Sequence, residues 1–213
     1  MTGPSDRRPL ASRDTGWARA SSRWLAATSV TPNQISMASM VAAALAGGAF
    51  WLAGSAEGTL RVIWLLAAAG FCQARLICNL LDGMVAVEGG KSAPDGPFWN
   101  EFPDRVADIL IFAGLGFGIG QPALGFAAAS MAVLTAYTRE LGGKIGAPAD
   151  FSGPMAKQHR MALVTSAAVA SVLEPLWSGH NGLLTLALWG VAIGAAATAL
   201  RRATRLVRYL KAH

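Results

Sequence analysis

Hydrophobic residues along this chain gather into six long segments that short polar turns separate. We place these segments at residues 34–54, 59–83, 102–119, 122–141, 158–174 and 182–203. A helix that crosses a bilayer needs about 20 mostly apolar residues, and most of the segments meet that length. The pattern therefore predicts an all-α, polytopic integral membrane protein with six transmembrane helices.

The residues before the first segment have a different character. Residues 1–33 are polar and basic, and we treat them as a cytoplasmic N-terminal segment that precedes a six-helix transmembrane domain at 34–213. Within them, residues 12–29 mix Arg and Trp in an amphipathic stretch, which indicates a helix lying in the membrane interface. A loosely ordered basic tail drawn to anionic lipids is the other interpretation. The segment lacks the apolar stretch of a cleavable signal peptide.

Composition supports the membrane interpretation. Of the 213 residues, 53% are hydrophobic and only 14% are charged, whereas a soluble domain averages about 25% charged residues. The same high apolar content excludes a disordered chain. A soluble globular protein of this composition would expose large apolar surfaces to water.

The positions of the cations predict the orientation of the segments. Of the 18 Lys and Arg residues, 14 gather before the first segment, around the fourth connection and after the last segment, and Lys91 follows the second segment. The connections at 54–58, 118–122 and 175–181 contain neither Lys nor Arg. Cytoplasmic loops carry the excess of Lys and Arg in membrane proteins. We therefore expect both termini to face the cytoplasm.

The acidic residues are concentrated at the cytoplasmic ends of the second and third segments. Six of the 12 fall between positions 82 and 108, namely Asp82, Glu88, Asp95, Glu101, Asp104 and Asp108. A carboxylate within a span costs about 2.5–3.5 kcal/mol on insertion scales, so it normally faces a cavity, a partner or an ion.

The spacing of these polar residues predicts that their side chains converge. Asn79 and Asp82 lie three positions apart, and Asp104 and Asp108 lie four apart, so each pair shares one helix face. Because the two segments are expected to be antiparallel neighbours, three carboxylates and one amide can meet. Carboxylates this close require a cation between them, and oxygen ligands suit Mg²⁺, Mn²⁺ or Ca²⁺. Gly83 would let a ligand approach the backbone.

Two stretches carry a resemblance to a known family. The segment NLLDGMVAV…NEFPDRVAD resembles the signature of the CDP-alcohol phosphatidyltransferases, which is D-x-x-D-G-x-x-A-R, a loop, and then G-x-x-x-D-x-x-x-D. The matching residues are Asp82, Gly83, Ala86, Asp104 and Asp108. The TPNQIS stretch at 31–36 looks like the T-P-N element that often opens this fold.

The chain departs from the signature at three positions. Asn79 stands at the first Asp, Val87 at the Arg and Asn100 at the second Gly, and the loop is about four residues longer than usual. Lys91 or Arg75 is a candidate to replace the lost Arg. A rival alignment would use Gly96, Asn100 and Asp104 and keep the normal loop. We prefer the first alignment because DRVAD matches the family ending and retains both late aspartates.

The resemblance implies a metal-dependent transferase with two divalent ions, Mg²⁺ or Mn²⁺. Such an enzyme moves the phosphatidyl group of CDP-diacylglycerol to an alcohol and releases CMP. The resemblance implies Asn79, Asp82, Asp104 and Asp108 as metal ligands, with Asp104 and Asp108 catalytic and Asp108 as the general base. It also implies that Gly83 and Ala86 admit the nucleotide, that the protein is a homodimer in the bilayer, and that it binds no nucleic acid.

A basic set downstream is a candidate site for the acceptor alcohol. Arg139, Lys144, Lys157 and Arg160 lie on the same predicted side as the aspartates. They suit an anion pocket for a phosphorylated acceptor such as glycerol 3-phosphate or inositol phosphate. For Lys144 and Lys157, ordinary enrichment of cations on the cytoplasmic side is the other interpretation.

A row of glycines ends the third segment at positions 114, 116, 118 and 120. Small residues at this spacing mark either a dimer face or close helix packing within one chain.

Two other functions compete with the transferase. Asn79 and Val87 suit a catalytically weakened or inactive relative that binds lipid or nucleotide in a regulatory role. A small transporter would use the carboxylates as a relay, but transporter sites lie near the membrane midplane, and these acids gather at one membrane face.

Overall fold

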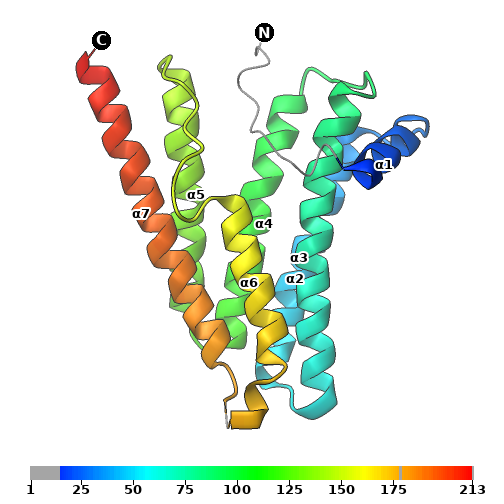
Figure 1. Cartoon of the computed structure of the whole chain (residues 1–213), viewed down its shortest axis with the longest axis vertical. Coiled ribbons are helices and arrows are strands. Elements are labelled where there is room, and N and C mark those ends of the chain that lie inside the picture. The colour runs from blue at the N-terminus through cyan, green and yellow to red at the C-terminus, as the bar shows by residue number, and fades with distance from the viewer. Residues whose placement is uncertain (1–14, 178, 213) are drawn as a thin grey trace.

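Seven α-helices make up the computed structural model, which describes residues 15–177 and 179–212 (Figure 1). The elements are α1 (Gly16–Ala26), α2 (Pro32–Ser55), α3 (Gly58–Val87), α4 (Gly96–Gly118), α5 (Pro122–Lys144), α6 (Lys157–Ser171), the short 3₁₀ helix η3 (Glu174–Trp177) and α7 (Gly182–Ala212). No strand occurs in these ranges. The all-α prediction is confirmed, and each of the six predicted segments corresponds to one helix, α2 to α7.

Three of these helices are long and apolar enough to cross a membrane. They are α2, α3 and α7, with 24, 30 and 31 residues. By contrast, α6 has only 15 residues, fewer than the roughly 20 that span a bilayer at full thickness. Membrane crossing by α4, α5 and α6, and so the full set of six spans, stays a prediction.

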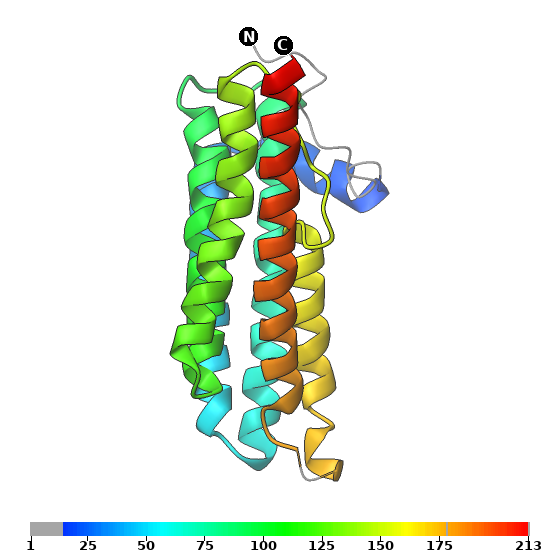
Figure 2. The ribbon, with the colours of Figure 1, turned by 90° about the vertical axis from the view of Figure 1, so that its left-hand side faces the viewer.

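The helices α2 to α7 run side by side in one elongated bundle (Figures 1 and 2). The connection between α5 and α6 descends from the upper end of α5, so that α6 begins well below it (Figure 1). This placement brings the first turn of α6 beside the polar parts of α3 and α4.

Helix α1 lies across the upper part of the bundle against α3 (Figure 1). Ala18 packs there in a small buried cluster with Leu80 and Met84. Trp17 and Trp24 are at least half exposed. The helix falls within the predicted interfacial stretch 12–29, whose residues 12–14 lie outside the described part. Its place in a membrane interface stays a prediction.

The TPNQIS stretch forms the start of α2. The Thr31 hydroxyl accepts a hydrogen bond from the Gln34 amide, and the Gln34 side chain accepts one from the Thr31 amide. Pro32 occupies the first turn, where its missing N–H costs nothing. This capping box fixes where α2 begins, and thereby the height of Ser36 one turn further on.

Glycines allow the backbones of α2, α4 and α5 to approach closely. A Cβ on Gly114 would lie 2.3 Å from the carbonyl oxygen of Gly47, and one on Gly118 would lie 2.3 Å from that of Phe50. Gly116 faces Gly125 of α5 in the same way. Of the two interpretations of the glycine row, the structure therefore shows packing within one chain. These contacts hold α4, with its aspartates, against its neighbours.

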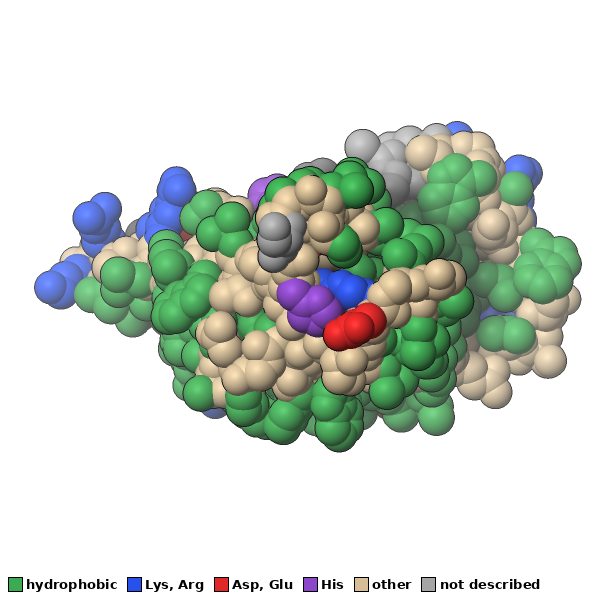
Figure 3. All heavy atoms as spheres, turned by 90° about the horizontal axis from the view of Figure 1, so that it is seen from below, with side chains coloured by type: hydrophobic (Ala, Val, Ile, Leu, Met, Phe, Trp, Pro, Cys, Tyr) green, Lys and Arg blue, Asp and Glu red, His purple; other side chains and the backbone are tan. Residues whose placement is uncertain are grey.

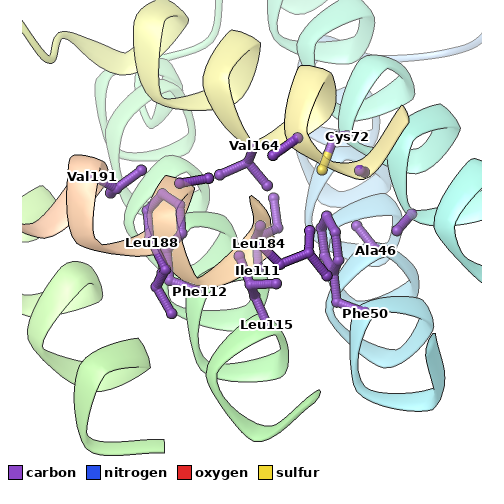
Figure 4. Packing of buried hydrophobic residues seen from close by; sticks show 14 of the residues in the cluster. Ala46, Phe50, Cys72, Ile111, Phe112, Leu115, Val164, Leu184, Leu188 and Val191 are labelled. Carbon is purple, nitrogen blue, oxygen red and sulfur yellow. The ribbon is translucent and has the colours of Figure 1, made fainter. Parts of the chain in front are cut away.

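Apolar side chains fill the middle of the bundle. Phe50 of α2, Phe112 and Leu115 of α4, Val164 of α6 and Leu188 of α7 are buried in one cluster (Figure 4). Cys72 lies in the same cluster as a free thiol, and Cys78 is also free. This core separates the polar groups of the upper half from those of the lower end.

An ion pair closes the lower end of the bundle. Arg61 Nη2 lies 3.4 Å from Glu174 Oε2, and both side chains are buried. Arg61 also donates to the carbonyl oxygens of Ala53 and His180, and Glu174 accepts from the Leu183 amide at the start of α7. Seen from below, this end is mainly hydrophobic or uncharged, with a small charged group at its centre (Figure 3).

Candidate active site

The predicted aspartates meet inside the upper half of the bundle. Asp82 projects from α3, and Asp104 and Asp108 project from one face of α4. All three side chains are buried, with residue exposures of 6%, 7% and 1%. Buried carboxylates are stable only where charges or hydrogen bonds compensate them, so their partners define what the site can do.

Arg75 of α3 joins the two aspartates of α4. Its Nη2 lies 3.0 Å from Asp108 Oδ1 and 3.4 Å from Asp104 Oδ1. The side chain is fully buried, and its Nε and Nη1 have no hydrogen-bond partner. One guanidinium nitrogen thus bridges two carboxylates.

Helix α6 supplies two further cations. The Arg160 Nη2 donates to Asp108 Oδ2 at 2.6 Å, and the Lys157 ammonium donates to Asp104 Oδ2. Arg160 is buried, whereas the Lys157 side chain is 23% exposed. The sequence analysis placed both residues in an acceptor pocket, but the structure brings them into direct contact with the acids.

Asp82 has a different environment. Its Oδ2 accepts a hydrogen bond of 2.6 Å from the Ser36 hydroxyl, and its Oδ1 lies 2.6 Å from the Gly83 amide nitrogen. Within the described residues it forms no ion pair. Asp82 is therefore the one buried acid of this group that has neutral partners alone, and a buried carboxylate without a counter-charge favours the binding of a cation.

Asn79 and Gly83 complete the lining on α3. The Asn79 Nδ2 donates to Asp104 Oδ1 at 2.5 Å, so the amide presents a donor to the acid cluster. A Cβ added to Gly83 would meet no atom within 4 Å. Open space therefore adjoins Gly83, and Ala86, one turn further, is only partly buried.

The geometry favours the preferred alignment of the signature. Asp104 and Asp108 both face inward, whereas Asn100 is exposed and lies within 3.5 Å of its neighbour Glu101. The rival alignment would place Asn100 in the site.

The residues fit one divalent ion better than two. Within 15–177 and 179–212, no three His, Cys, Asp or Glu side chains are grouped closely enough to hold a metal ion. Both oxygens of Asp104 and of Asp108 already accept from protein donors. Only Asp82 lacks a cation. Mg²⁺ is commonly bound through one or two carboxylates together with substrate phosphates and water. Asp82 and Asn79 could therefore hold one such ion without a third protein ligand.

A cavity of about 330 Å³ lies between α5, the following connection and α7. Three arginines, Arg139, Arg202 and Arg205, are among the residues that line it. Of the four predicted acceptor residues, only Arg139 lines it, and Lys144 is exposed at the end of α5. Thr135 connects the two regions, because its hydroxyl accepts from Arg160 and its carbonyl accepts from Arg202.

Hydrogen bonds fix the charge of one acid on the wall of this cavity. Burial raises the pKa of Asp150, but hydrogen bonds from Ser152 and the nearby Arg205 outweigh it and hold that pKa below its ordinary value. Asp150 thus carries a negative charge that orients Arg205.

Both candidates for the lost signature Arg have other partners. The Lys91 ammonium donates to three backbone carbonyls at the end of α1 and just after it, those of Leu25, Thr28 and Val30. Arg75 holds the aspartates of α4. Arg105 pairs with Glu101 at 2.9 Å, as its spacing predicts.

Sequence reasoning missed two members of the site. Ser36 was noticed only as part of the TPNQIS stretch, although it lies one turn into a helix that starts beside the acids. Arg75 was considered only as a replacement for the signature Arg. Its spacing of four and seven from Asn79 and Asp82 places all three on one face of α3, and that signal was available.

Curated relatives share part of the sequence. The chain is 30% identical over 138 residues to the phosphatidylinositol phosphate synthase of Streptomyces avermitilis, covering 61% of this chain and 57% of that protein. It is 34% identical over 115 residues to the bifunctional IPC transferase and DIPP synthase of Rubrobacter xylanophilus, covering 53% and 24%. It thus spans about half of the first relative and a quarter of the second. Inner membrane protein YnbA of Escherichia coli is 28% identical, with 79% and 80% covered.

Solved structures share the fold. The phosphatidylinositol phosphate synthase of Mycobacterium tuberculosis with CDP-DAG bound superposes with a TM-score of 0.73 at 18% identity, covering 89% of this chain and 92% of that one. A second structure of that protein, in complex with manganese and citrate, gives a TM-score of 0.72. No protein-family model matches the chain.

Proposed function

We propose that this chain belongs to the CDP-alcohol phosphatidyltransferase family, which its relatives and its signature support, and that it transfers a phosphatidyl group from CDP-diacylglycerol to an alcohol and releases CMP. The observation that carries the proposal is the meeting of Asp104 and Asp108 with three buried or half-buried cations inside the bundle that also buries Asp82. Such a site combines charges that bind a pyrophosphate with a carboxylate that accepts a proton.

The nucleotide binds beside α3 in this proposal. Open space adjoins Gly83, and Ala86 is the next small residue on that side of the helix, so the backbone can be approached closely. The pyrophosphate then lies near Arg75, Lys157 and Arg160, whose positive charges offset its own. Lys157 can leave Asp104 for a phosphate oxygen, because its partly exposed ammonium sits on a flexible stem.

Asp108 accepts the proton of the acceptor hydroxyl. Arg75 and Arg160 pair with its two oxygens and favour the ionised form that a general base requires. The acceptor oxygen forms a bond to the phosphorus that bears the diacylglycerol, the bond from that phosphorus to the CMP oxygen breaks, and CMP leaves. Asp104 positions Arg75 and Lys157 for this step.

A divalent ion, Mg²⁺ or Mn²⁺, is the cofactor that we propose. Asp82 and Asn79 would hold it, and the ion would supply Lewis-acid neutralisation of the pyrophosphate. A structural relative has been solved in complex with manganese, which supports a metal in this fold.

The acceptor binds in the cavity between α5 and α7. Arg139, Arg202 and Arg205 line it, and guanidinium groups bind phosphate through paired hydrogen bonds. The guanidinium carbon of Arg139 also lies 5.5 Å from the ring centroid of Phe151, a cation–π contact that helps to orient this side chain. We therefore propose a phosphorylated alcohol, such as glycerol 3-phosphate or inositol phosphate, as the acceptor.

The proposed setting is a bilayer that all six helices α2 to α7 cross, with both termini and the acid cluster on the cytoplasmic side. The distribution of cations supports this orientation. A homodimer remains our expectation from the family resemblance.

The test uses purified full-length protein in detergent with labelled CDP-diacylglycerol, Mg²⁺ or Mn²⁺, and a panel of alcohols and phospho-alcohols. We expect CMP release that depends on the acceptor and on the metal, with a phospho-alcohol as the best acceptor. Failure to release CMP with every acceptor, together with failure to bind CDP-diacylglycerol, would overturn the proposal.

A second candidate function rests on the saturation of Asp108. Because both of its oxygens are in ion pairs, a protein that binds a CDP-linked lipid without transferring it also suits the site. The same assay separates the two functions, since this candidate requires CDP-diacylglycerol binding with no CMP release.

A further inference from the structure

The strongest unexplained feature is the position of Arg75. Its Nη2 lies between Asp104 Oδ1 and Asp108 Oδ1, at 3.4 and 3.0 Å. A cation that contacts one oxygen from each of two carboxylates takes the part that a bridging metal ion would play. The guanidinium is fully buried and projects from the middle of α3, so it cannot leave as an exposed side chain could.

The cations around Asp104 and Asp108 already neutralise these two acids without a metal ion. Asp104 and Asp108 carry two negative charges. Arg75, Arg160 and Lys157 pair with them, and Arg105 Nη2 also lies 3.8 Å from Asp104 Oδ2, so four positive charges are in contact with the two acids. A divalent ion added there would meet an excess of positive charge in a buried setting, where repulsion is poorly screened.

The buried polar atoms that lack a hydrogen-bond partner also argue against a metal ion here. The buried atoms around Asp108 without hydrogen-bond partners are Arg75 Nε, Arg75 Nη1 and Arg160 Nε, and all three are donors. A metal ion needs acceptors, whereas every oxygen of Asp104 and Asp108 already accepts from a positively charged donor, which the oxygens of Asp82 do not. Asn79 also turns its Nδ2 toward Asp104.

We propose that Arg75 is a resident cation that takes the place of one of two metal ions, so that the site holds at most one divalent ion, beside Asp82. This inference rests on the proposed function, which supplies the identity of the substrate. The number of bound ions, however, can be measured without any turnover. Arg75 acts as a positioning residue for Asp104 and Asp108, and its charge replaces that of an ion that would otherwise bridge them.

The test counts Mn²⁺ ions bound per chain on purified full-length protein, with and without CDP, from the electron paramagnetic resonance signal of free Mn²⁺. We expect the unmodified protein to bind no more than one ion. The double variant Arg75→Met with Asn79→Asp removes the resident charge and adds a carboxylate, so its count should rise by one.

Two controls keep the proposal falsifiable if the double variant does not fold. Arg75→Lys retains the charge, and Asn79→Asp alone retains Arg75, so both should keep the count of the unmodified protein. Two ions on the unmodified protein would overturn the proposal. A second ion gained by Asn79→Asp alone would also overturn it, because the amide and not Arg75 would then set the count.

CMP release measured on the same preparations separates this proposal from the proposed function. Two bound ions with CMP release would overturn only the role of Arg75. One ion or fewer without any CMP release or lipid binding would overturn the transferase and leave the ion count as found.

Discussion

Two clusters of buried charge lie at opposite ends of the same core, and their partners differ in kind. At the lower end, Arg61 pairs with Glu174, and both also bind backbone groups of connections and helix ends. In the upper half, Arg75, Lys157 and Arg160 meet the aspartates of α4 through side chains alone, apart from one long contact to the Asp104 carbonyl.

This difference in partners indicates that the lower pair stabilises the fold and that the upper cluster is the reaction site. In the lower pair one positive charge balances one negative charge. The pair connects the end of α2 to the start of α7, so its contacts hold these helix ends together. The upper cluster has an excess of donors near Asp108, an acid without a counter-charge at Asp82, and open space at Gly83. Unbalanced groups beside open space are typical of a site that awaits a charged ligand.

Asp104→Asn should have the largest effect on activity. It removes the charge that orients Arg75 and Lys157, and we expect a loss of about 100- to 1,000-fold in kcat/KM for CMP release, as for the removal of one electrostatic group from an active site. The matched control is Glu88→Gln, which changes an exposed acid at the end of α3. Equal losses in both variants would contradict the assignment.

Arg61→Met should destabilise the protein strongly without changing its chemistry. Glu174 would remain buried and unpaired, which costs about 3–5 kcal/mol. Thermal unfolding in detergent should show a lower Tm, whereas CMP release per folded protein should be unchanged. The double variant Arg61→Met with Glu174→Met should recover part of the stability, and a drop in the rate per folded protein would place the lower pair in the reaction.

Gly114→Ala should loosen the contact between α2 and α4. The new Cβ would lie 2.3 to 2.5 Å from backbone atoms of Gly47, so the helices must separate, at about 1–3 kcal/mol. Thermal unfolding measures the loss, and Gly48→Ala is the control because a Cβ there meets no atom within 4 Å. Equal stability of the two variants would refute the close approach.

Lys91→Met should have the smallest effect, confined to α1. It removes hydrogen bonds to three carbonyls at the end of that helix and just after it, worth about 1 kcal/mol. Hydrogen exchange should speed up at residues 16–30 and not elsewhere in the bundle. Lys144→Met, at an exposed position, should leave exchange unchanged, and faster exchange throughout the bundle would show that Lys91 supports more than α1.

The fold was largely predictable because apolar segments must become helices in a membrane. Residues 34–54 correspond to α2 at Pro32–Ser55. The prediction was less accurate where polar residues continue a helix, since α4 starts at Gly96 and α7 extends to Ala212. Hydropathy detects apolar faces, whereas backbone hydrogen bonds continue through the polar turns at their ends.

The site was predictable only within each helix. The spacing of Asp104 and Asp108 and that of Asn79 and Asp82 fixed two faces, and the structure brings them together. The approach of Lys157 and Arg160 depends on where α6 begins in the bundle, about 50 residues along the chain. Local periodicity carries no information on such tertiary distances. Lys157 and Arg160, which neutralise the acids in the structure, were therefore predicted to bind the acceptor alcohol.

The central claim is that the upper cluster performs the transfer and the lower one does not. The most direct measurement compares acceptor-dependent CMP release by Asp108→Asn and Glu174→Gln, both assayed below their melting temperatures and normalised to folded protein. We predict that Asp108→Asn loses release by at least about 100-fold, as expected for a general base, and that Glu174→Gln retains most of it. Retained release in Asp108→Asn, or equal loss in both, would contradict the claim.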